Sequence, residues 1–127
     1  MLLSVVFSFR NEQDVIPELI RRMRRTLDPL ELDYELIFVN DASTDGSPER
    51  IEEAYPEVIL IRNGENLGFV GGSNIGIEYA LERGASYILL LNNDTVAHPD
   101  LLKELVAVAE ADPEIGIVGP KIYFHHP

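Results

Sequence analysis

The sequence predicts an α/β fold in three layers, with a mostly parallel sheet between two layers of helices. Short apolar runs alternate with amphipathic stretches along all 127 residues, which is the pattern of repeated strand and helix units. The runs are continuously apolar, as strands are when helices cover both faces of a sheet. The connections are short, which favours right-handed crossovers within a single domain, residues 1–127.

The first half of the chain predicts two strands and two helices. The first strand is a β-branched apolar run, and it is followed by a helix in which apolar residues recur every four positions. Ser47 before Pro48 is typical of a helix start, with serine as the N-cap and proline at the first helical position. We expect strands at residues 2–9 and 35–39, and helices at residues 14–27 and 47–55.

The second half predicts three strands, at residues 58–61, 87–91 and 115–118, and helices at residues 70–83 and 98–111. The inward face of the first of these helices is expected to carry Val70, Asn74, Ile77 and Leu81. Gly72 and Gly76 lie four apart in the same helix and permit the close approach of a backbone or a ligand. The glycines match neither a dinucleotide-binding fingerprint nor a P-loop, since no lysine follows them.

The charge of the chain restricts its partners. It has 22 acidic and 10 basic residues, a net charge of −12 at pH 7, which excludes a nucleic-acid partner because phosphate backbones require a basic face. Cysteine is absent, which excludes disulfides, thiolate zinc sites and cysteine nucleophiles. No apolar run approaches the roughly 20 residues that span a bilayer, so we expect a cytoplasmic protein.

Four of the ten basic residues lie in the predicted helix 14–27: Arg21, Arg22, Arg24 and Arg25. A solvated helix face, with cations near the negative end of the helix dipole, accounts for them. Contact with anionic lipid is the alternative interpretation.

Polar and acidic residues follow each of the first four predicted strands. Ligands of parallel α/β sheets bind at the carboxyl ends of the strands, so these four loops define a candidate binding site. Asp94 follows the predicted strand 87–91 after two asparagines. It could supply a carboxylate to Mg²⁺, or it could be a turn residue before the next helix. Asp41 could accept hydrogen bonds from a base or ribose, or close an Asx-turn, whereas Asp45 and Ser47 are assigned to turn and cap.

Together these residues resemble the family 2 glycosyltransferases, which have a GT-A fold. The resemblance rests on four segments in order, residues 3–12, 38–47, 66–76 and 92–94, the last standing where the family has its metal-binding D-x-D. Residues 10–12 and 16–19 are similar to polyprenyl-phosphate sugar transferases. Residues 66–81 and 89–95 are more similar to rhamnosyltransferases.

The resemblance implies a truncated, Rossmann-like GT-A sheet that binds a nucleotide-diphospho-sugar, linked to UDP, GDP or dTDP, for transfer to an acceptor hydroxyl. It implies Mg²⁺ or Mn²⁺ at Asp94, aided by Asn92. The nucleotide-binding residues it implies are Ser8, Phe9, Arg10, Asn11, Glu12, Asp41, Arg62, Asn66, Asn74 and Asn93.

No residue after Asp94 resembles the carboxylate that deprotonates the acceptor in this family. We therefore expect a donor-binding half that lacks the acceptor-binding half and does not complete the transfer alone. In a longer protein this half would work at the cytoplasmic face of the membrane. The alternative is a non-catalytic module that forms a homodimer through its uncovered sheet edge.

Overall fold

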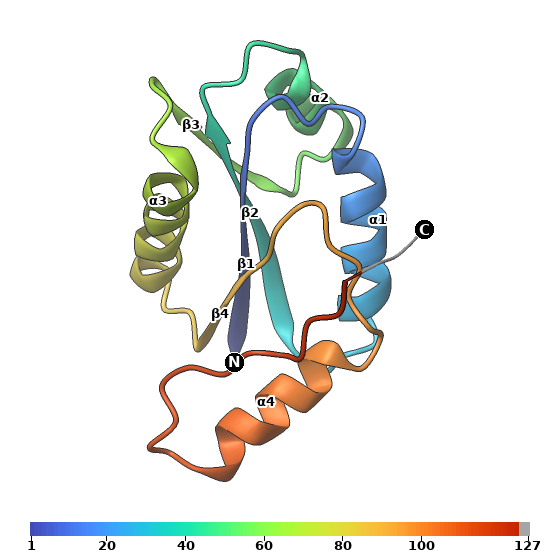
Figure 1. Cartoon of the computed structure of the whole chain (residues 1–127), viewed down its shortest axis with the longest axis vertical. Helices are drawn as coiled ribbons and strands as arrows, with labels where there is room; N and C mark the ends of the chain where they lie inside the picture. Colours follow the sequence, from blue (N-terminus) through green and yellow to red (C-terminus); the bar gives the residue numbers. More distant parts are fainter. Residues whose placement is uncertain (125–127) are drawn as a thin grey trace.

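The structure is a computed structural model that describes residues 1–124, and its centre is a four-stranded sheet (Figure 1). The strands are β1 (Leu2–Phe9), β2 (Asp33–Asp41), β3 (Ile59–Asn63) and β4 (Tyr87–Leu90). Their order across the sheet is β3-β2-β1-β4, and every neighbouring pair is parallel. The predicted parallel sheet is confirmed, with β1 and β2 at its centre.

Four helices connect or follow the strands: α1 (Ile16–Leu27), α2 (Ser47–Ala54), α3 (Gly68–Glu82) and α4 (Leu101–Ala111). Figure 1 shows α3 on one side of the sheet and α1 on the other. Two separate apolar clusters fill the two interfaces, which confirms the three-layer arrangement.

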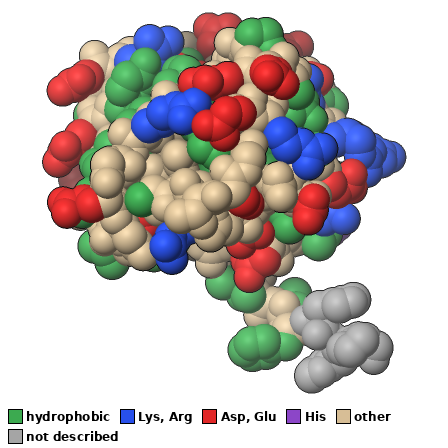
Figure 2. All heavy atoms as spheres, turned by 90° about the horizontal axis from the view of Figure 1, so that it is seen from above, with side chains coloured by type: hydrophobic (Ala, Val, Ile, Leu, Met, Phe, Trp, Pro, Cys, Tyr) green, Lys and Arg blue, Asp and Glu red, His purple; other side chains and the backbone are tan. Residues whose placement is uncertain are grey.

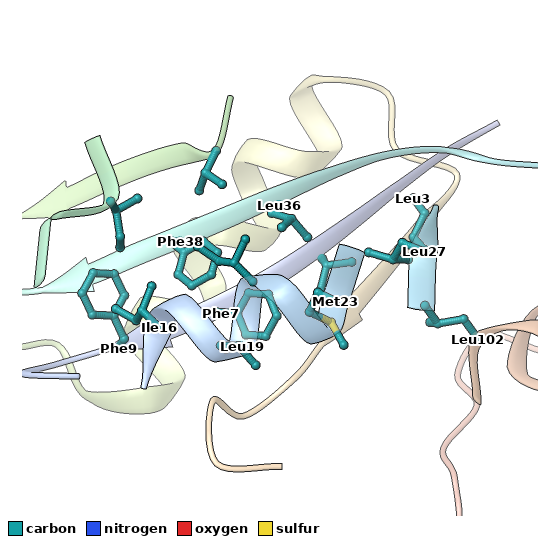
Figure 3. Packing of buried hydrophobic residues seen from close by; sticks show 14 residues of the cluster. Leu3, Phe7, Phe9, Ile16, Leu19, Met23, Leu27, Leu36, Phe38 and Leu102 are labelled. Carbon is teal, nitrogen blue, oxygen red and sulfur yellow. The ribbon is translucent and has the colours of Figure 1, made fainter. Parts of the chain in front are cut away.

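The larger cluster packs α1 against β1 and β2 (Figure 3). Phe7 and Phe38 are fully buried and stack with their ring centroids 4.8 Å apart. Phe9 meets the edge of Phe38 at 6.1 Å, while Leu19 and Met23 of α1 cover the rings. The two central strands are therefore fixed to each other and to α1 by aromatic packing.

The predicted inward face of α3 is wrong. Val70 and Leu81 are 70% and 60% exposed, and Asn74 is exposed as well. The buried residues of α3 are small: Gly72, Ser73, Gly76 and Ala80. Because this helix is apolar on most sides, its periodicity did not identify the buried face. The glycines decide it, since they let the helix backbone lie directly on the sheet.

Replacing Gly76 by alanine tests this close contact. A Cβ atom at Gly76 would collide with Cγ1 of Val6, a buried core residue that would have to shift. We expect Gly76→Ala to lower the free energy of unfolding by about 1–3 kcal/mol in urea denaturation. Gly116→Ala, where an added Cβ meets nothing within 4 Å, is the control and leaves stability nearly unchanged. Equal stability of both variants would refute the close packing of α3.

The predicted fifth strand at residues 115–118 is also wrong. This segment is irregular in the structure, and Ile117 is 94% exposed. An apolar run forms a strand only where a neighbouring strand accepts its backbone hydrogen bonds, and within residues 1–124 none pairs with this one. β4 consequently has one unpaired edge, and its Leu90 is 44% exposed.

Three of the four arginines of α1 pair with two nearby carboxylates. Arg21 and Arg22 donate to Glu18 at 2.7–2.8 Å, and their hydrogen bonds lower the pKa of Glu18 to about 2. Arg24 pairs with Glu57. These exposed ion pairs are the contacts expected of a solvated helix face, and contact with anionic lipid stays a prediction. Within residues 1–124, no helix combines the length and the apolar character needed to cross a bilayer.

Candidate functional site

Parallel pairing brings the carboxyl ends of all four strands, and the polar loops that follow them, to the same end of the sheet. We call this end, formed by residues 8–12, 40–47, 62–68 and 91–95, the rim. Figure 2 looks onto the rim and shows Asp and Glu side chains interspersed with Lys and Arg. The rim is where a ligand of this sheet would bind.

Asn11 joins the loop after β1 to the loop after β2. Its Oδ1 accepts hydrogen bonds from the backbone N–H of Thr44 at 2.7 Å and of Asp45 at 3.2 Å, while its own N–H donates to Ser43 Oγ at 3.0 Å. Asn11 has a positive φ of 55°, a conformation that asparagine tolerates better than most residues. The sequence suggested a direct nucleotide contact and gave no sign of this positioning role.

Asp45 and Ser47 fix the start of α2. The Ser47 hydroxyl is buried, donates to Asp45 and accepts from the N–H of Glu12 at 3.1 Å. The predicted N-cap is displaced by one residue: α2 begins at Ser47, and Asp45 Oδ1 accepts from the Ser47 N–H at 2.9 Å. Burial raises the pKa of Asp45, but the hydrogen bonds from Ser47, together with those from the backbone N–H groups of Gln13 and Asp45, outweigh burial and hold the pKa below the ordinary 3.8.

The lowered pKa of Asp45 makes its contribution to stability depend on pH. Because the folded pKa lies below the unfolded one, the stabilisation is complete well above pH 3.8 and is lost as the pH falls through the folded value. We expect Asp45→Asn to lower the free energy of unfolding by about 1 kcal/mol at pH 7, and by progressively less as the pH falls below 3.8. Urea denaturation across this pH range measures the change. Asp33→Asn, at the exposed start of β2, is the control; a pH-independent loss for Asp45→Asn would contradict the assignment.

Asp41 is a cap for α3. Its carboxylate is buried and accepts from the N–H of Leu67 at 2.7 Å through Oδ1 and from the N–H of Gly68 at 3.0 Å through Oδ2. A carboxylate at this position also interacts favourably with the positive end of the helix dipole. Neither sequence interpretation of Asp41 included this cap, which joins residues 26 positions apart. Its contact with a nucleotide stays a prediction.

Arg62 and Asn66 are engaged within the chain. Arg62 pairs with Glu49 at 3.3 Å and Glu52 at 2.7 Å, so two carboxylates of α2 offset its charge. Asn66 Oδ1 accepts from the N–H of Gly68 at 3.0 Å. Asn74 lies on the exposed side of α3, where its side chain is open to solvent.

The predicted residues at the end of β1 differ in accessibility. Phe9 is only 3% exposed, so its side chain belongs to the core and only its backbone could meet a ligand. Ser8 is half-buried beneath Gly72, where an added Cβ would meet its Oγ. Arg10, in contrast, is exposed and makes no ion pair with any residue of 1–124.

Asn63 is a rim residue that the sequence did not identify. It ends β3 and lies in register with Asp41, and its Nδ2 is buried without a hydrogen-bond partner among the described residues. The sequence places it in a turn, where asparagine is too common to stand out. Its unused donor adds to the polar groups at this end of the sheet.

Asn92, Asn93 and Asp94 form a turn after β4, in which Thr95 Oγ1 donates to the Asn92 carbonyl at 2.7 Å. Asp94 is exposed and hydrogen-bonds to no residue of 1–124. No group of three or more His, Asp or Glu residues that could hold a metal occurs in the described part. One carboxylate with neighbouring carboxamides fits Mg²⁺ or Mn²⁺ shared with a ligand's phosphates, rather than a cage made by protein alone.

The chain belongs to glycosyl transferase family 2, whose family model matches residues 4–125. Among curated relatives, the undecaprenyl-phosphate 4-deoxy-4-formamido-L-arabinose transferase of Proteus mirabilis is 32% identical over 115 residues, which is 84% of this chain and 33% of the relative. The glycosyltransferase YkcC of Bacillus subtilis is 32% identical over 81% of this chain and 32% of its own length. The chain thus spans about a third of the length of these relatives.

Solved structures confirm the GT-A type of fold. The mannosyltransferase PcManGT from Pyrobaculum calidifontis, in complex with GDP-Man and Mn²⁺, superposes with a TM-score of 0.74 at 25% identity, covering 90% of this chain and 33% of that one. TarS of S. aureus superposes with a TM-score of 0.71 at 21% identity, and the match covers 87% of this chain and 33% of the TarS chain. A further TarS structure holds UDP-GlcNAc.

Proposed function

We propose that the rim binds the nucleotide-diphospho-sugar donor of a glycosyl transfer. The observation that carries this proposal is the parallel sheet, which gathers four polar loops at one end of a family 2 chain. Structural relatives that hold GDP-Man and UDP-GlcNAc support it.

In this proposal the loops after β1, β2 and β3 hold the nucleotide, and the turn after β4 faces its diphosphate. Asp94, with Asn92, would hold Mg²⁺ or Mn²⁺. Such an ion supplies charge neutralisation to a departing nucleoside diphosphate, a Lewis-acid role. Asn93 is only half-exposed in the same turn and would bind the nucleotide.

We further propose that residues 1–127 act as the donor half of the reaction. The carboxylate that would deprotonate the acceptor hydroxyl is not assigned to any residue of this chain. The relative from Proteus mirabilis is named for undecaprenyl phosphate, a lipid phosphate. An acceptor of that class would place the reaction at the cytoplasmic face of a membrane.

Calorimetric titration tests the donor site. We expect UDP, GDP or dTDP to bind with measurable heat when Mn²⁺ is present. Asp94→Ala should weaken this binding about tenfold or more, because it removes the carboxylate that would hold the ion. Asp33→Ala removes an exposed carboxylate at the opposite end of β2 and should leave binding unchanged. Absence of heat with all three nucleotides would refute the proposal.

Self-association through the unpaired edge of β4 is a second proposal. The exposed Leu90 on that edge is the observation that favours it, since uncovered apolar edges promote pairing between chains. Light scattering at increasing protein concentration measures it. A dimer that Leu90→Lys converts to monomer would support the proposal, and a monomer at all concentrations would refute it.

A further inference from the structure

We propose that Arg10 contacts the diphosphate of the donor and gives the rim an affinity for nucleoside diphosphates that does not require a metal ion. This inference rests on the proposed function and adds to it, because it assigns the charge compensation of the diphosphate to a side chain of this protein.

Most cations of the chain already have a partner. Six of its ten basic residues form ion pairs with carboxylates, and Lys121 lies over the ring of Tyr123. Within residues 1–124, the remaining cations, which have neither an ion pair nor an aromatic partner, are Arg10, Arg25 and Lys103.

Only Arg10 among these three belongs to the rim. It directly follows β1, a central strand, at its carboxyl end. Arg25 is in the last turn of α1, which runs back toward the amino end of the sheet, and α4, which carries Lys103, lies across that amino end (Figure 1). A free guanidinium is thus present at the one end of the sheet where a ligand is expected.

The other positive groups of the rim are already occupied. Two carboxylates of α2 offset the charge of Arg62. The first N–H groups of α3 donate to Asp41, which also adds a negative charge to the positive end of that helix. In a chain of net charge −12, a diphosphate would be repelled unless a local cation compensated it.

The strand register brings Arg10 and Asp94 into neighbouring loops. β1 pairs with β4 from Leu3 opposite Tyr87 to Val6 opposite Leu90, and the N–H of Leu91 still donates to the Val6 carbonyl at 3.2 Å. Arg10 and Asp94 each lie four positions beyond the last paired residues, Val6 and Leu90, toward the rim. β1 itself continues to Phe9, whereas β4 ends at Leu90. A guanidinium can donate two parallel hydrogen bonds to phosphate oxygens, which suits it to one side of a diphosphate.

Binding of UDP, GDP and dTDP in EDTA, without any divalent ion, tests this inference. We expect the wild-type chain to bind at least one of the three, and Arg10→Ala to weaken that binding about tenfold or more. Arg10→Lys should retain part of the affinity, because it keeps the charge without the planar pair of donors. Arg25→Ala is the matched control and should bind as the wild type does.

The corresponding nucleosides, which lack phosphates, identify what Arg10 touches. The wild type and Arg10→Ala should bind the nucleosides with the same affinity. The diphosphates, in contrast, should bind the wild type more tightly than Arg10→Ala. Equal losses for nucleoside and diphosphate, an unchanged affinity in Arg10→Ala, or wild-type binding only with Mn²⁺ would each overturn the inference. Absence of binding with and without Mn²⁺ would instead refute the proposed function itself.

Discussion

The hydrogen bonds of Asn11 to the loop after β2 are the interaction on which the rim depends. They tie together the segments that leave the two central strands, and the buried Ser47 hydroxyl adds a second link through the N–H of Glu12. Loops on a parallel sheet are otherwise free to separate, since the strand hydrogen bonds end before them. A ligand would therefore meet an arrangement that exists before it binds, which lowers the ordering cost of binding.

The other side of the rim is set by α3. Gly72 and Gly76 bring this helix close to β1 and β2, and Asp41 of β2 caps its first turn. The close packing leaves no room for a side chain at Gly72 or Gly76, while Ala80 and its apolar neighbours fill the rest of the interface. The contact of the helix backbone with the sheet and the cap by Asp41 hold α3 in position. The helix can therefore expose Val70 and Leu81.

The sequence predicted the parallel sheet and all four helices, because burial between two helix layers produces continuous apolar runs that are readable without coordinates. The sequence-based prediction was wrong where the structure of one segment depends on which segment lies beside it. Residues 115–118 have strand composition but no strand beside them, and the face of α3 is decided by glycines instead of large apolar residues. The position of the rim loops at one end of the sheet was predicted from the parallel topology. The partners of Asp41, Arg62 and Asn11 were not, because each lies on a different element.

Amide chemical-shift mapping tests the proposed nucleoside-diphosphate site at the rim most directly. The nucleoside diphosphate that binds would be titrated, with Mg²⁺, into ¹⁵N-labelled protein. The account predicts the largest shift changes at residues 8–12, 41–46, 66–68 and 92–95. Changes confined to α4 and the amino ends of the strands would contradict it.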